Sequence, residues 1–270
     1  MAKTQGISFL YQFDVGNKYV DNPAQQIQFV TSTAPGDFDV ANITSESTRE
    51  RWRSAEVLTW QEIIIKADLK SNLDTIAILG HNFTENAVIQ LQANIANNFA
   101  APPVTVNIPW RKDNLVWLNE LGAEYEYYRL RILDPTNPCG FVEFGRFIGG
   151  RAFTFSNNED IRDQFSIGKQ DFADKMKTEG FFRQSNQRVK VRTLSASFAK
   201  LETKQGLNIA NFEGLRTMFD IVGTTVPLLT VLDRGNPDLF TAWGQFDQIP
   251  AESFTTNEFM TSNFKFAEVF

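Results

Sequence analysis

Short apolar stretches separated by turns constrain this chain more than any other feature. Residues 76–79 are continuously apolar and stop at Gly80, as in a strand buried on both faces. Residues 87–93 and 128–132 alternate apolar with polar side chains, as half-buried strands do. We predict two more strands, within 57–68 and over 141–148. Strands at this spacing, without intervening helices, predict a β-sandwich over residues 40–150.

Residues 1–39 are predicted to form an N-terminal strand and a connector. Ile7, Phe9, Tyr11 and Phe13 share one face, opposite polar residues, which predicts a half-buried strand over 6–15. A second short strand is expected near 27–31, before a turn that contains proline and glycine.

A second β unit is predicted over residues 188–270. Its strands are expected at 188–198, 226–232, 239–246 and 263–270. Between the first two lies a predicted helix, about 204–222, with one apolar stripe at spacings of three and four. Thr203 is a candidate N-cap and Gly223 suits the left-handed residue that ends a helix. The stripe consists of Ile209, Phe212, Leu215 and Phe219.

Residues 151–187 differ in composition and pattern from both units. This segment is polar and charged, and it is too long for an ordinary linker. We interpret it as an extended arm or linker, so the chain is expected to divide near residue 150.

Composition excludes several classes of function. The 25 Phe, against 5 Trp and 5 Tyr, point to β-rich cores or to wide subunit contacts. A net charge of −6 without a basic cluster argues against nucleic-acid recognition. A single cysteine, Cys139, excludes an internal disulfide and most zinc sites. No apolar run predicts a secretion signal or membrane insertion.

No catalytic group emerges, and neither a metal nor a cofactor is expected. His81 is the only imidazole that could act as a base; we interpret it as structural, hydrogen-bonded in a turn after a strand. A pH-sensitive or ligand-binding His81 is the alternative. The sequence contains no phosphate-binding glycine loop. The acids Glu124, Glu126, Asp134 and Glu143 leave a carboxylate hydrolase open as a third reading.

Two sets of residues are candidates for binding. Aromatic rings with polar handles suit the apolar faces of sugars, which makes candidate glycan-binding residues of Trp110, Trp117, Tyr125 and Tyr127. The alternative is that these rings seal the sandwich edge or fill a subunit contact. The candidates for inter-subunit contact combine a basic strand face with the aromatic residues of the arm: Arg188, Lys190, Arg192, Phe153, Phe155, Phe165, Phe172, Phe181 and Phe182.

The first unit resembles a known family. Residues 51–54 (Arg-Trp-Arg-Ser), 75–83 and 127–132 resemble discoidin-like, carbohydrate-binding β-sandwiches. With residues 134–146 they form a pattern, LGHN…YYR…DP.NP.G…E.GR, that is similar to tail-tip and minor tail proteins of siphophages. The final third is similar, more loosely, to the tail-tube-related domain of distal tail proteins.

The resemblance implies a mainly β fold of two β-sandwich-like domains. The first would be discoidin- or jelly-roll-like, and the second tail-tube-like with one α-helix. It implies a non-catalytic structural protein of the virion tail, made in the host cytoplasm. Its partners would be other copies in a hexameric ring, the tail tube protein and tail-tip hub proteins. The alternative function is a lectin-like module that binds a host glycan or receptor.

Overall fold

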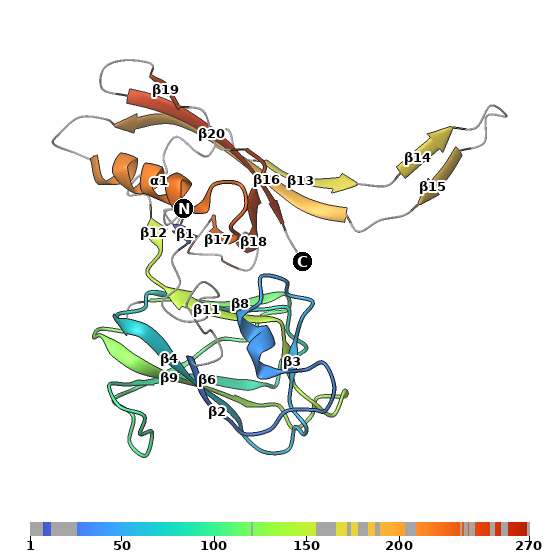
Figure 1. The fold of residues 1–270 in the computed structure, drawn as a ribbon, viewed down its shortest axis with the longest axis vertical. Coiled ribbons are helices and arrows are strands. Elements are labelled where there is room, and N and C mark those ends of the chain that lie inside the picture. The colour runs from blue at the N-terminus through green and yellow to red at the C-terminus, as the bar shows by residue number, and fades with distance from the viewer. Residues whose placement is uncertain are drawn as a thin grey trace. The chain divides into compact units, whose positions relative to one another are not determined.

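A computed structural model of the 270-residue chain shows a mainly β protein, as expected (Figure 1). Its four smaller sheets are antiparallel, and the described part of the chain contains one α-helix. No helix in that part is long and apolar enough to cross a membrane. The described residues are 8–11, 26–119, 121–154, 166–171, 174–177, 183–186, 190–202, 209–232, 234, 237, 241–248, 252–254 and 259–268.

The chain forms two compact units. Unit 1 comprises Met1–Ile7, Thr154–Val231 and Ala242–Val269. Unit 2 comprises Ser8–Phe153, Leu232–Thr241 and Phe270.

Unit 2 contains a five-stranded sheet. Along β9, Tyr128, Leu130 and Ile132 are buried, while Arg129 and Arg131 are partly exposed. This confirms the predicted alternation, in which one face joins the core and the other meets solvent. The strand order is β2 (Ile27–Val30), β4 (Gln61–Ser71), β9 (Tyr125–Leu133), β6 (Val88–Asn94) and β7 (Val104–Asn107).

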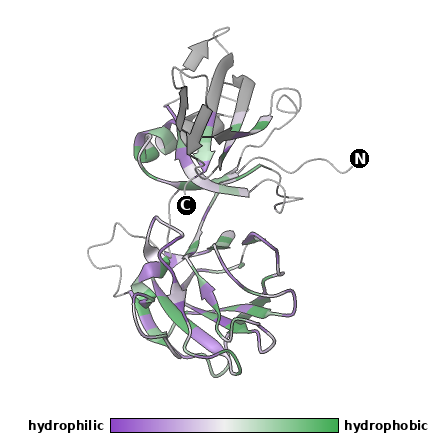
Figure 2. Cartoon of the chain, turned by 90° about the vertical axis from the view of Figure 1, so that its right-hand side faces the viewer, coloured by the Kyte–Doolittle hydropathy of each residue, from purple (hydrophilic) through white to green (hydrophobic). Residues whose placement is uncertain are grey.

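A three-stranded sheet forms the second layer of the sandwich (Figure 1). All five residues of its central strand, β5 (Thr75–Leu79), are buried, as predicted for a strand covered on both faces. Ile76, Ile78 and Phe147 from this layer share one hydrophobic cluster with Ile63 and Leu130 of the five-stranded sheet. Figure 2 shows hydrophobic and hydrophilic residues mixed over the strands of unit 2. The flanking strands are β8 (Asn114–Leu118) and β11 (Arg146–Gly150).

Two sequence predictions for unit 2 were wrong in detail. The predicted strand 141–148 is two strands, β10 (Glu143–Phe144) and β11, because the backbone of Thr48 packs against Gly145 between them. β10 pairs instead with β3 (Trp52–Arg53). The first strand, β1 (Ser8–Leu10), is buried throughout rather than on one face: it lies between β12 and β17 in a sheet, and the Ser8 hydroxyl accepts a hydrogen bond from Arg234 Nη1 at 3.1 Å.

The largest sheet has eight strands. Its order is β12 (Phe153–Thr154), β1, β17 (Leu228–Val231), β18 (Thr241–Phe246), β20 (Phe259–Glu268), β16 (Lys190–Glu202) and β13 (Ser166–Asp171), with β19 (Glu252–Phe254) also paired to β20. All four residues of β17 are buried, in agreement with the strand predicted near 226–232.

The helix α1 (Ile209–Val222) lies within the predicted span and ends where predicted. Gly223 has a φ of 54°, and its N–H donates to the Phe219 carbonyl at 2.9 Å. Phe219 is buried and meets Phe246 edge-on, with ring centroids 5.4 Å apart. Residues 203–208, and the side chains of Ile209, Phe212 and Leu215, lie outside the described residues.

The segment 151–187 contains regular strands. β13 pairs with β16 up to the residue pair Asp171 and Lys190. Beyond that pair, β14 (Asp174–Lys177) and β15 (Arg183–Asn186) form an antiparallel sheet of their own, labelled in Figure 1. The two pairs of strands together make up a long β arm, which we define as residues 166–202.

Candidate functional site

Asn82 joins the two halves of the sequence pattern that spans residues 79–83 and 134–146. Its Nδ2 donates to the Phe141 carbonyl at 3.0 Å, and its Oδ1 accepts from the Glu143 N–H at 2.8 Å. The Asn82 N–H donates to the Glu143 carbonyl at 3.2 Å. The side chain therefore extends strand-like pairing beyond the end of β5.

Asp134 is buried and holds the turn that follows β9. Its carboxylate accepts from the Thr84 N–H at 2.8 Å, from the Thr84 hydroxyl at 2.5 Å and from Asn137 Nδ2 at 3.0 Å. Asn137 Nδ2 also donates to the Asn82 carbonyl at 3.1 Å. Three hydrogen bonds satisfy the buried carboxylate of Asp134 within the protein, so this side chain stabilises the turn.

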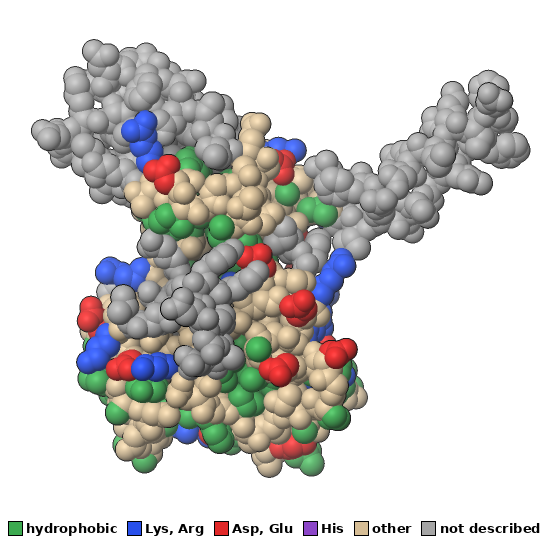
Figure 3. Space-filling view, viewed as in Figure 1, with side chains coloured by type: hydrophobic (Ala, Val, Ile, Leu, Met, Phe, Trp, Pro, Cys, Tyr) green, Lys and Arg blue, Asp and Glu red, His purple; other side chains and the backbone are tan. Residues whose placement is uncertain are grey.

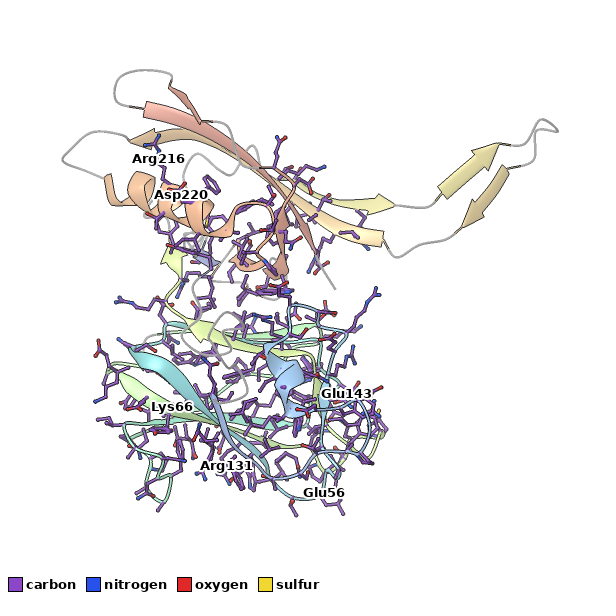
Figure 4. The ribbon with its side chains drawn as sticks, in the orientation of Figure 1. Glu56, Lys66, Arg131, Glu143, Arg216 and Asp220 are labelled. Carbon is purple, nitrogen blue, oxygen red and sulfur yellow. The ribbon has the colours of Figure 1, made fainter. Side chains whose placement is uncertain are left out.

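Glu143 is bound by two arginines from a distant part of the chain. Arg51 Nη1 donates to one carboxylate oxygen at 2.6 Å, and Arg53 donates to the other through Nε at 3.0 Å and Nη2 at 2.7 Å. The Arg53 guanidinium lies 3.7 Å from the ring centroid of Phe38 and 3.9 Å from that of Phe141. Figure 4 labels Glu143.

Arg146 is fully buried and binds the backbone at the end of the short helix η2 (Val40–Thr44). Its Nη1 donates to the carbonyls of Thr44 and Ser45. We call Asn82, Asp134, Asn137, Glu143 and Arg146 the motif clasp. The clasp ties residues 44–53 to the loops after β5 and β9.

His81 lies beside the clasp and makes the hydrogen bond in the turn that the sequence predicts. Its Nδ1 accepts from the Phe83 N–H at 3.1 Å, and the ring stacks on Phe83 with centroids 4.7 Å apart. Burial lowers the pKa of His81 to about 4, against a smaller opposing effect of the Arg111 backbone. The imidazole is therefore neutral near pH 7.

The exposed side of the five-stranded sheet carries a second polar group of side chains. Strand register places Glu62 opposite Arg131, Arg131 opposite Gln90, and Gln90 opposite Asn107. We call this line of four residues the polar row. Figure 4 labels Arg131, and Figure 3 shows basic and acidic side chains interspersed over the visible surface of unit 2.

Ion pairs and rings hold the polar row in place. Arg131 Nε donates to Glu62 Oε1 at 2.7 Å, and the guanidinium lies 4.2 Å from the ring centroid of Trp60. Arg129, two residues before Arg131 on β9, lies 3.5 Å from the other Glu62 oxygen and donates to Gln92 Oε1 at 2.7 Å. Burial lowers the pKa of Arg129 from its usual value, but a guanidinium stays charged near pH 7.

The four aromatic residues proposed for glycan binding come from three segments: the loop before β8, β8 itself and β9. Trp110 Nε1 donates to the Phe83 carbonyl at 2.9 Å, and its ring packs against the core. Trp117 is on β8 and also packs against the core. On β9, Tyr125 is buried within the core, and Tyr127 is partly exposed near Lys66.

Most of the proposed inter-subunit residues lie outside the described residues, namely Arg188, Phe155, Phe165, Phe172, Phe181 and Phe182. Phe153 is partly buried on β12. Lys190 begins β16, and Arg192 Nη2 binds Glu268 Oε1 at 2.7 Å. Arg192 therefore meets an acid of its own subunit.

Three of the four acids considered for hydrolysis are engaged by other partners. Glu143 binds arginines, Asp134 binds Thr84 and Asn137, and Glu126 pairs with Lys66 at 3.2 Å. Among the described residues no group of three His, Cys, Asp or Glu side chains could hold a metal ion.

Sequence reasoning missed the polar row. The run Ile63-Ile64-Ile65 hides the alternation of β4, so Glu62 did not stand out. The sequence shows Gln90 in one alternating strand and Arg129 and Arg131 in another. Only the strand register shows that the two strands are neighbours.

No family model matches this sequence, and no curated protein matches it. Similar solved structures include the following three. A CBM32 module from a family 31 glycoside hydrolase of Clostridium perfringens has 17% identity and a TM-score of 0.38, covering 47% of this chain and 90% of that one. A chitosan-binding module from Paenibacillus sp. IK-5 has 16% identity and a TM-score of 0.35, covering 47% and 96%.

The third structure is the N-terminal domain of the single-strand break repair protein XRCC1, with 10% identity and a TM-score of 0.36, covering 47% of this chain and 97% of that one. Two of the three are carbohydrate-binding modules by name, and none of the three is described as a tail protein. At these identities and TM-scores the likeness identifies neither a family nor a ligand for this chain.

Proposed function

We propose that the protein is a non-catalytic structural component of a bacteriophage tail, a distal-tail or tail-tip ring part that joins the tail tube to the tip complex. The observation that carries the proposal is the motif clasp. The residues that resemble tail proteins bind one another and the backbone, as Asn82 and Arg146 do. Because these residues are used for internal hydrogen bonds, they suit a rigid structural module better than an active site.

The β arm supplies a means of assembly. A ring forms when the same contact repeats around a closed rotation, and an extended pair of strands can reach a neighbouring copy. The pair β14–β15 continues past the last β13–β16 pair. In the proposed ring, this extension contacts the adjacent subunit.

Light scattering after size exclusion, followed by electron microscopy, tests this function on the full chain. The informative variant replaces residues 172–189 with Asn-Gly, a two-residue turn that can join the paired residues Asp171 and Lys190. We expect rings from the natural chain, and folded monomers with an unchanged melting temperature from the variant. A natural chain that stays monomeric at high concentration contradicts the ring. Complete rings from the variant contradict the role of the arm.

A second candidate function is a lectin-like module that binds a host glycan. The polar row favours it, because amide and guanidinium groups lie side by side and are at least partly exposed. Such a module does not need to form a ring. A monomer that binds a glycan would therefore support this candidate over the first.

A further inference from the structure

The polar row offers hydrogen-bonding groups that the protein itself does not use. Gln90 Nε2 donates to Asn107 Oδ1 at 3.2 Å, which leaves Gln90 Oε1 and Asn107 Nδ2 without a partner among the described residues. Arg131 uses Nε for Glu62, and neither of its Nη atoms has an acceptor in the described part of the chain. Along three adjacent strands, the Nη donors of Arg131, the Oε1 acceptor of Gln90 and the Nδ2 donor of Asn107 thus follow one another.

The groups of the row are already held in position. The Trp60 ring and the Glu62 carboxylate fix the Arg131 guanidinium, whose side chain is 22% exposed. The Gln90–Asn107 bond restrains both amides. Side chains that are ordered before binding lose less conformational entropy when a ligand arrives.

The charge at the row favours an anionic ligand. Arg129 and Arg131 share the single carboxylate of Glu62, which leaves one positive charge uncompensated in this network. The adjacent Lys66 is balanced by Glu126.

The distribution of apolar residues favours a sugar over a protein. Protein interfaces have an apolar centre and a polar rim. Here the centre is polar, and the exposed apolar side chains, Phe29 on β2 and Val88 at the start of β6, lie at the margins of the sheet face. Hydroxyl and carboxylate groups along a glycan match a line of guanidinium and amide groups.

We propose that Arg131, Gln90 and Asn107 form a binding site for an acidic glycan, with Trp60 and Glu62 as positioning residues. This inference rests on the second candidate function and is independent of ring assembly. The Arg131 Nη atoms bind a sugar carboxylate, and the two amides bind hydroxyls.

Isothermal titration calorimetry on the full chain tests the site with oligogalacturonate as the acidic probe and a galacto-oligosaccharide as its neutral counterpart. We expect the natural chain to bind the acidic probe more tightly, and the binding to weaken as salt is added. Arg131→Gln and the double variant Gln90→Ala/Asn107→Ala should each weaken binding about tenfold or more, since each removes bonds to charged or polar groups. Arg49→Gln makes the same charge change in the exposed loop before β3 and should bind normally.

Melting temperatures of the variants show whether the sheet stays folded. The double variant also leaves the ion pair between Arg131 and Glu62 in place. Absence of binding to both probes overturns the site, whether or not rings form. Acidic-glycan binding that Arg131→Gln and the double variant leave unchanged also overturns it, although the lectin-like function then stands. A protein partner captured by this face, with no glycan bound, equally contradicts the proposal.

Discussion

Arg53 donates two hydrogen bonds to one carboxylate oxygen of Glu143, 90 residues further along the chain. The pair joins β3 to β10, whose register places these residues opposite each other. The rings of Phe38 and Phe141 pack against the Arg53 guanidinium and shield the charges of the pair from solvent.

Glu143→Gln should destabilise unit 2 by about 2 kcal/mol. The amide keeps a hydrogen-bond acceptor but leaves Arg51 and Arg53 without a counter-charge in a partly buried site. Urea unfolding measures the loss. The control Glu126→Gln breaks a more exposed pair with Lys66 and should leave the urea midpoint unchanged. Equal midpoints for the natural chain and Glu143→Gln would contradict the role of the clasp.

Gly145→Ala should destabilise the same unit more than Gly140→Ala. A methyl group on Gly145 would overlap the Thr48 backbone, which cannot move without breaking the contacts of the 44–53 segment. Gly140 has a φ of 72° but open space around it, so alanine there costs about 1 kcal/mol of backbone strain. Thermal unfolding of the two variants gives the comparison, and the reverse order would show that Gly145 is not packed as described.

The stability of unit 2 should fall as the pH is lowered from 7.5 to 5.5. The unfolded chain takes up a proton on His81 near its ordinary pKa of about 6.5, whereas the folded chain resists until about pH 4. The unfolded state therefore binds more protons in this window. The loss is on the order of 1 kcal/mol, and it disappears above the unfolded pKa.

His81→Gln is the matched control, because His81 is the only histidine in the chain. Glutamine can accept a hydrogen bond in the turn but does not titrate, so assembly at neutral pH should change little. A pH dependence that persists in His81→Gln would assign it to another group.

Phe219→Ala should destabilise unit 1 by about 3–5 kcal/mol. The ring is buried and contacts Phe246, which in turn contacts Phe266 with centroids 5.9 Å apart. Ile221→Ala, on the exposed side of the same helix at 44% exposure, should have little effect. Melting curves followed by circular dichroism compare the two variants. Similar melting temperatures for both would contradict the packing of α1.

Local patterns in the sequence were sufficient for most of the elements. The unbroken apolar run of β5, the alternation of β9 and the glycine after α1 each predicted a structure that the fold contains. Such signals are local, because side-chain period and left-handed backbone depend on residues within a few positions.

Contacts between distant residues could not be read in the same way. The burial of Ser8 depends on Arg234, and the break at Gly145 depends on Thr48. The sequence leaves open whether Glu143 and Asp134 are catalytic acids, because it does not show the partners that bind their carboxylates in the structure.

Hydrophobic period and turn residues act over short distances, so the amino-acid pattern is enough to predict a mainly β protein with one helix and a histidine in a turn. Which polar side chains meet depends on the tertiary structure. Strand register aligns Glu62, Arg131, Gln90 and Asn107 across four strands. A shift of one residue would turn each of these side chains to the opposite face, so the polar row exists only through the pairing.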